Sequence, residues 1–185
     1  MSSSPQTATA QPAAPRVFAA AADRIAAETR VAIVVARWNE TITRRLLDAA
    51  VASFTLAGLP ATALDVIWVP GSFELTLVAD RIAAGGRHAA VVCLGAIIKG
   101  ETSHDQHIAR AVAHGIEEVG RMRGLPVVFG VLTCDTLAQA MARAGDNGTA
   151  AGADRFAGNK GAEAAAAAIE MVALVRQLRS SAVCP

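Results

Sequence analysis

Four short apolar runs recur along the chain, each followed by a segment with helical periodicity. The runs span residues 31–36, 63–69, 89–98 and 127–132 and are rich in β-branched residues and alanine. Such runs predict strands, and residues 31–36 in particular read as a buried strand of a parallel sheet. Helices are predicted after them, from about residue 42 to 57 and over residues 72–84, 103–123, 136–144 and 159–178. Repeated strand–helix units predict an α/β fold, with helices on both faces of a four-stranded parallel sheet.

The 185 residues suit a single domain, predicted over residues 30–180. Residues 1–29 read as a disordered or partly ordered N-terminal extension, and residues 181–185 as a C-terminal tail. Within the extension, the alanines around Asp23 and Arg24 can form a short helix, so residues 17–30 stay ambiguous.

Composition argues against several partner classes. With 17 basic and 16 acidic residues the net charge is +1, which disfavours a nucleic-acid or anionic-membrane surface. No apolar run reaches the roughly 18 residues of a membrane span, and no secretory signal is evident. An odd number of cysteines without such a signal fits a reducing cytoplasm, and Cys93, inside an apolar run, is predicted to be a buried inert thiol.

Residues 93–107 combine a strand end, a glycine loop and a helix start. Gly100, Glu101 and Thr102 can offer backbone N–H groups and a hydroxyl to a phosphate. His104 follows at the helix N-terminus, where the dipole favours a neutral imidazole that can carry a proton. A capping or surface histidine is the equal alternative. The loop is neither a Walker loop nor G-x-G-x-x-G, and no ligand pattern beyond His104 and His107 supports a metal.

The other strand ends also carry polar or aromatic residues, where ligands bind in parallel α/β folds. Trp38 can stack on a flat ring or pack in the core, whereas Trp68 is expected in the core or an interface. Glu74 can complement a helix dipole or accept hydrogen bonds from a polyol. Arg143 and Lys160 bracket a long loop and are solvated surface charges unless a phosphate lies nearby.

Five segments in order make the chain resemble the lumazine synthase family, whose members form 6,7-dimethyl-8-ribityllumazine in riboflavin biosynthesis. They are RWNE (37–40), VPGSFE (69–74), LGAIIKGETSH (94–104), FGVLT (129–133) and NKGAEAA (159–165). The resemblance covers about residues 30–178. It implies a flavodoxin-like three-layer α/β/α sandwich that assembles into homopentamers, with active sites between adjacent subunits.

The resemblance also implies a reaction and its residues. The substrates would be 5-amino-6-(D-ribitylamino)uracil and 3,4-dihydroxy-2-butanone 4-phosphate, joined by a transferase in the penultimate step of the pathway, without cofactor or metal. His104 would be the acid/base. Trp38 would stack on the pyrimidine, Glu74 would hold the ribityl chain, and Arg143 would come from the neighbouring subunit to bind phosphate. The other substrate-binding residues would be Asn39, Gly71, Ser72, Phe73, Ala96, Ile97, Ile98, Lys99, Glu101 and Thr102, with Phe129 and Lys160 also from the neighbour.

Two departures from the family pattern matter. Trp38 replaces the usual Phe, which keeps the stacking surface. Residues 146–156 lengthen the connection between Arg143 and Lys160, which in the family accompanies free pentamers rather than 60-subunit capsids. A pentamer is therefore favoured, and the direction in which Lys160 points stays open.

Two other functional classes compete with the enzyme. A non-catalytic flavin- or lumazine-binding relative would keep Trp38 and Glu74 but not need His104 or Arg143. A structural shell protein would suit the alanine-rich faces, yet it leaves the polar strand ends unexplained.

Overall fold

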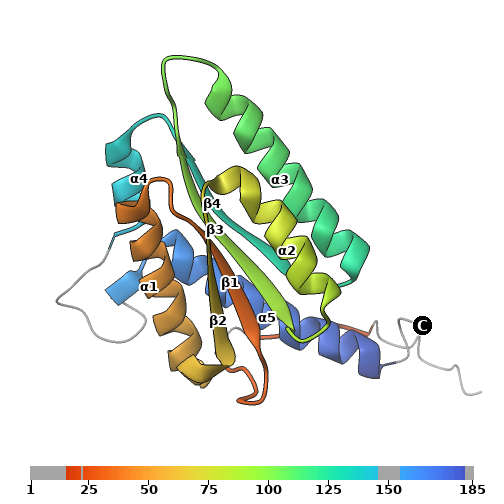
Figure 1. Cartoon of the computed structure of the whole chain (residues 1–185). Helices are drawn as coiled ribbons and strands as arrows, with labels where there is room; N and C mark the ends of the chain where they lie inside the picture. The colour runs from red at the N-terminus through yellow and green to blue at the C-terminus, as the bar shows by residue number, and fades with distance from the viewer. Residues whose placement is uncertain (1–15, 22, 146–154, 182–185) are drawn as a thin grey trace, which may run out of the picture.

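The computed structural model describes residues 16–21, 23–145 and 155–181 (Figure 1). Most of the predicted N-terminal extension (1–29), inserted loop (146–156) and C-terminal tail (181–185) lies outside the described residues.

The sheet has four parallel strands in the order β2-β1-β3-β4, which confirms the predicted fold class. The strands are β1 (Val31–Ala36), β2 (Leu64–Val69), β3 (Ala90–Ile98) and β4 (Val127–Cys134). Because both central strands, β1 and β3, are covered on both faces, they read as continuous apolar runs rather than as alternating ones.

Two helical layers cover the sheet, so the molecule is a three-layer sandwich (Figure 1). Ile33 and Val35 point toward α1 (Glu40–Leu56), α4 (Leu137–Arg143) and α5 (Lys160–Ser180). The intervening residue Val34 packs in the opposite layer with α2 (Leu75–Ala84) and α3 (His104–Arg123). The predicted inward stripe of α3 is confirmed, since Val112 and Ile116 are buried.

Helices α1 and α5 approach each other closely at Gly161. A Cβ on this residue would lie 2.0 Å from the carbonyl oxygen of Leu46 in α1, so only glycine fits. The preceding Asn159, 1% exposed, caps α5 by accepting a 2.8 Å hydrogen bond from the Gly161 N–H. Its amide also donates to the Gly145 carbonyl at 2.9 Å. The start of α5 is therefore fixed against both α1 and the end of the α4 segment.

One strand boundary differs from its prediction, and one ambiguous segment forms no helix where it is described. Strand β4 runs to Cys134 rather than residue 132, because Thr133 and Cys134 still pair with Ile97 and Ile98 of β3. No helix forms among the described residues between 16 and 30. Tertiary contacts hold that segment instead, including a 3.1 Å hydrogen bond from the Ile25 N–H to the Ala57 carbonyl.

A charged cluster stabilises the amino end of the sheet. The Asp65 carboxylate accepts hydrogen bonds from Arg30 at 2.8 and 2.9 Å, and it pairs with the Nε2 of His88 at 2.7 Å. Arg30 and, to a lesser extent, His88 hold the pKa of Asp65 below its usual value. The cluster joins the segments that lead into β1 and β3 to the edge strand β2.

The cysteine prediction holds where the structure describes it. Cys93 lies at 0% exposure in β3, and burial raises the pKa of its thiol to about 12. Cys134 is also buried and free. None of the described helices has the length and apolar character needed to cross a membrane.

Candidate active site

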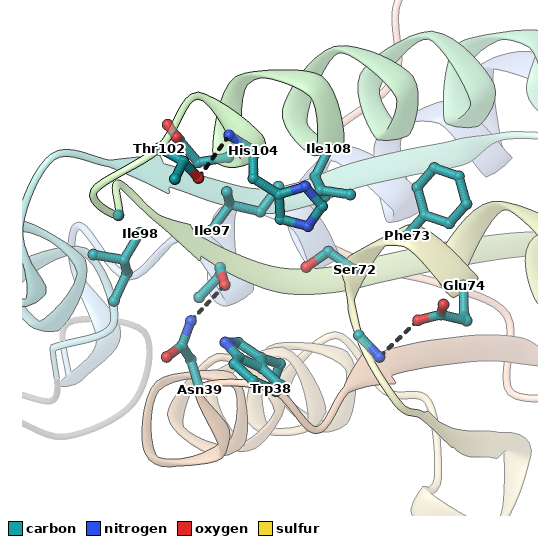
Figure 2. A pocket seen from close by; sticks show the side chains of 14 residues that line it. Trp38, Asn39, Ser72, Phe73, Glu74, Ile97, Ile98, Thr102, His104 and Ile108 are labelled. Carbon is teal, nitrogen blue, oxygen red and sulfur yellow. Dashed lines mark hydrogen bonds between the residues drawn. The ribbon is translucent and has the colours of Figure 1, made fainter.

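A pocket of about 800 Å³ opens beyond the carboxyl ends of β1, β2 and β3 (Figure 2). Three segments that follow these strands supply most of its walls, as the rule for parallel sheets predicts. Its lining residues are Trp38, Asn39, Gly71, Ser72, Phe73, Glu74, Ala96, Ile97, Ile98, Gly100, Thr102, His104, Asp105 and Ile108.

Trp38 lines the pocket and is not part of the core, since it is 74% exposed. Its backbone N–H donates to the Pro70 carbonyl at 3.0 Å, and the Arg37 N–H donates to the Val69 carbonyl at 2.8 Å. The loop after β1 is thereby joined to the loop after β2. Trp68, in contrast, is partly buried against the core, with the Arg44 guanidinium 5.1 Å from the centre of its ring.

Asn39 has a left-handed backbone, with φ 62° and ψ 42°. Asparagine tolerates this conformation better than most residues because its short side chain can make local hydrogen bonds. Its Nδ2 donates to the Ala96 carbonyl of β3 at 2.8 Å (Figure 2).

The turn after β2 presents a hydroxyl, an aromatic ring and a carboxylate. Ser72 is buried, and a Cβ on Gly95 would come within 2.6 Å of its Oγ, so β3 needs glycine there to admit the serine. Phe73 is 56% exposed at the pocket. The Glu74 carboxylate accepts a 2.9 Å hydrogen bond from the Gly71 N–H (Figure 2). Glu74 therefore shapes its own turn while lining the pocket.

The glycine loop and the start of α3 form the remaining wall. His104 is the first residue of α3, and its N–H lies 3.4 Å from Thr102 Oγ1. Figure 2 shows Thr102 and His104 on one side of the pocket and Trp38 on the other. The Ser103 side chain makes no capping hydrogen bond within the described chain. The Gln106 and His107 N–H groups donate to the Ser103 carbonyl, so Asp105 carries the one first-turn N–H without a partner among the described residues. Lys99 and Glu101 are exposed and do not line this pocket.

Phe129, Arg143 and Lys160 gather elsewhere, in a second pocket of about 400 Å³ beside β4. Phe129 is 44% exposed on this edge strand. Arg143 Nη1 donates to the Gln139 carbonyl at 3.1 Å, and Lys160 Nζ pairs with Glu163 at 2.6 Å. The two pockets share no lining residue. Within one chain, the structure brings together most of the predicted site and separates these three residues from it.

Sequence reasoning missed several lining residues. Ile108 and Asp105 line the first pocket, and Glu163 lines the second. Ile108 was visible as the first position of the inward stripe of α3. Asp105 Oδ1 is buried without a hydrogen-bond partner among the described residues, a property that depends on packing. Glu163 could have been predicted as a neighbour of Lys160, because it lies three residues after Lys160 on a helix.

The histidines of α3 do not assemble a metal centre with other ligands. Among the described residues, no group of three or more His, Cys, Asp or Glu side chains gathers in a way that could hold a metal ion.

Comparisons with known proteins agree on one family. The family model described as 6,7-dimethyl-8-ribityllumazine synthase matches residues 28–176. A relative from Spinacia oleracea, named "6,7-dimethyl-8-ribityllumazine synthase, chloroplastic", is 46% identical over 145 residues. This alignment covers 78% of the chain and 61% of the relative, so the chain spans about three fifths of that protein's length.

Proposed function

Because the chain belongs to the 6,7-dimethyl-8-ribityllumazine synthase family, we propose that it is the transferase of that name. It condenses 5-amino-6-(D-ribitylamino)uracil with 3,4-dihydroxy-2-butanone 4-phosphate. The products are 6,7-dimethyl-8-ribityllumazine, phosphate and water. The observation that carries the proposal is a single pocket that combines Trp38, Ser72 and His104 with a glycine loop at a helix start.

The pyrimidine substrate is assigned to the side of the pocket formed by Trp38 and the turn after β2. An exposed indole offers a flat face for a heteroaromatic ring. Ser72, Phe73 and Glu74 line the adjoining wall, where hydrogen-bonding groups suit the ribityl hydroxyls. The backbone of Ala96, Ile97 and Ile98 lies between the two sides.

The phosphate substrate is assigned to the loop that contains Gly100 and Thr102. The positive end of the α3 dipole and the Thr102 hydroxyl favour an anion there. His104, at the same corner, is the proposed general acid/base. The amine attacks the ketone and water leaves to give an imine; phosphate elimination and a second carbonyl condensation then close the ring. Each step moves a proton, and holding both substrates together contributes about 7–11 kcal/mol.

The active site is proposed to form between adjacent subunits of a homo-oligomer. Support comes from the separation of Phe129, Arg143 and Lys160 from the first pocket of the same chain. A neighbouring subunit that presents its second pocket would add an aromatic ring and two cations to the phosphate corner. The glycine loop alone carries no lining cation, so an arginine from outside the chain would complete it.

A pentamer is proposed as the assembly, and a reducing compartment such as the cytoplasm as its location. The long connection between Arg143 and Lys160 supports the free pentamer over a 60-subunit capsid. The buried free thiols of Cys93 and Cys134 support the reducing compartment. The word chloroplastic belongs to the name of the Spinacia oleracea relative.

The decisive experiment mixes the two substrates with the full chain and follows the fluorescence of the lumazine product. Product formation that needs both substrates and protein supports the transferase. Tight binding of the lumazine without turnover would instead support a non-catalytic lumazine-binding protein. Absence of both would overturn the proposed function. Native mass spectrometry of the same sample gives the subunit number.

A further inference from the structure

Within its own chain, the indole of Trp38 has little packing to hold it in place. With 74% exposure, its orientation depends on the backbone on either side. On the amino-terminal side, the hydrogen bonds of Arg37 and Trp38 to the loop after β2 fix the chain. On the carboxyl-terminal side, the next residue is Asn39, whose carbonyl already accepts the 2.9 Å hydrogen bond that starts α1.

Asn39 does not use its side chain as helix caps usually do. An N-cap side chain normally accepts a hydrogen bond from the second or third helical N–H, but Asn39 makes no such bond. Its Nδ2 instead crosses to the Ala96 carbonyl, 57 residues further along the chain. This hydrogen bond joins the loop that carries Trp38 to β3, whose carboxyl end lines the pocket between its two sides.

We propose that Asn39 is a positioning residue whose amide bridge to Ala96 sets the orientation of the Trp38 ring. Family resemblance implies that Asn39 helps position the pyrimidine. The geometry indicates that it does so through Trp38, because the amide donor is directed at β3. The role toward the pyrimidine rests on the proposed function. The hydrogen bond from Asn39 to Ala96 and its effect on Trp38 do not depend on that function.

The left-handed backbone of Asn39 and its hydrogen bond to Ala96 make separable contributions to the orientation of Trp38. Asn39→Gly keeps the positive φ without strain and removes the bridge. Asn39→Asp keeps the size of the side chain and much of its tolerance of this conformation. It replaces the donor with an oxygen that faces the Ala96 carbonyl, so it removes the attraction and adds repulsion. Both variants should lose the orientation of Trp38, with Asn39→Asp at least as affected.

The test uses the fact that the chain has two tryptophans. In a Trp68→Phe background, the emission comes from Trp38 alone. We expect Asn39→Gly and Asn39→Asp to lower the fluorescence anisotropy of Trp38 while the native oligomer is retained. Glu40→Gln is the matched control, because Glu40 is the exposed neighbour, pairs with Arg44 and does not line the pocket. Anisotropy equal to that of the parent in both Asn39 variants would overturn the inference, whether or not the protein has the proposed activity.

Kinetics provide the second readout. Loss of one hydrogen bond predicts a rise of about two- to tenfold in KM for the pyrimidine. The KM for the butanone phosphate should stay within error, since Thr102 and His104 lie on the other side of the pocket (Figure 2). An equal rise in both KM values would contradict a role specific to Trp38. If the parent makes no product, the proposed function fails, and the anisotropy result still decides whether the bridge orients Trp38.

Discussion

His104 occupies a position that suits proton transfer better than structural support. It begins α3 and lines the pocket, and its backbone N–H rather than its ring makes the hydrogen bond to Thr102. The side chain is exposed, so its removal leaves no cavity in the core. A loss of activity in a variant at this position would therefore reflect chemistry and not folding.

We expect His104→Ala to keep the native assembly and to lower kcat by roughly 10²–10⁴-fold, the usual contribution of a general acid or base. The product-fluorescence assay measures the rate, and light scattering checks assembly. His107→Ala is the control, because His107 is exposed on the next turn of α3 and does not line the pocket. A His104→Ala enzyme as fast as the His107→Ala enzyme would refute the assignment.

The polarity of strand ends allowed most of the first pocket to be predicted from the sequence. Trp38, Ser72 and His104 each follow a strand, and the parallel topology brings such positions together. The choice between stacking and core packing at Trp38 needed the structure, because exposure depends on what packs around the ring. The hydrogen bond from Asn39 to Ala96 could not be predicted either, because it depends on how close two segments far apart in the sequence lie in the fold.

At the scale of elements, the packing of α5 on α1 depends on the lack of a side chain at Gly161. The sequence motif Asn159-Lys160-Gly161 acts as a unit: the asparagine caps α5 and the glycine allows close contact with α1. Lys160, between them, therefore points into the second pocket despite the long connection before it. Its Nζ pairs with Glu163, which lines the same pocket.

Gly161→Ala should destabilise the fold, because the new methyl group would meet the Leu46 backbone, which cannot rotate away. We expect a loss of about 1–3 kcal/mol, the usual cost of overpacking. Denaturant unfolding of the assembled protein measures it. Gly100→Ala serves as the matched variant, since nothing lies within 4 Å of a Cβ at that position. Equal unfolding midpoints for the two variants would contradict the close helix contact.

Asp65→Asn should remove a pH-dependent part of the stability. The folded-state pKa of Asp65 lies below its unfolded value of about 3.8, so its ion pairs stabilise the fold above that pH. The contribution is lost as the pH falls through the folded pKa. The carboxylate is 42% exposed, so we expect less than about 1 kcal/mol. Unfolding free energies at pH 6 should differ between wild type and variant, and those in strong acid should converge. A difference that grows toward acid would be evidence against this reading.

Strand positions could be predicted from apolar runs, most clearly for β1 and β3, which are buried on both faces. The end of β4 did not, since Thr133 and Cys134 pair with β3 through backbone groups that the sequence does not reveal. The alanines near Asp23 favoured a helix locally, but the Ile25 N–H pairs with the end of α1 instead. Tertiary hydrogen bonds outweighed local propensity there.

On the scale of the whole molecule, the separation of the two pockets is the reason why a single chain is proposed not to form a complete active site. The first holds Trp38 and His104, and the second holds Arg143 and Lys160. In a ring of identical subunits, each contact would join the first pocket of one chain to the second pocket of the next. Each subunit would then take part in two active sites.

Two inactive variants should therefore restore activity when they assemble together. In a random mixture of His104→Ala and Arg143→Ala chains, about one quarter of the contacts in a heterologous ring would join two intact halves. Co-expression followed by the fluorescence assay tests this. A mixture of His104→Ala with Trp38→Ala is the control, because both changes lie in the first pocket and no contact can supply both residues. Equal activity in the two mixtures would exclude a site shared between subunits.

The proposed division of one site between two subunits would also have a consequence for inheritance. A chain defective in both pockets but able to assemble would disable its own site and the one it completes for a neighbour. Such an allele would behave as dominant-negative, because each defective chain would disable two sites, one of which uses the first pocket of a normal chain. An allele that prevents assembly, such as one that drives α1 and α5 apart, would leave rings of normal chains intact and would be recessive.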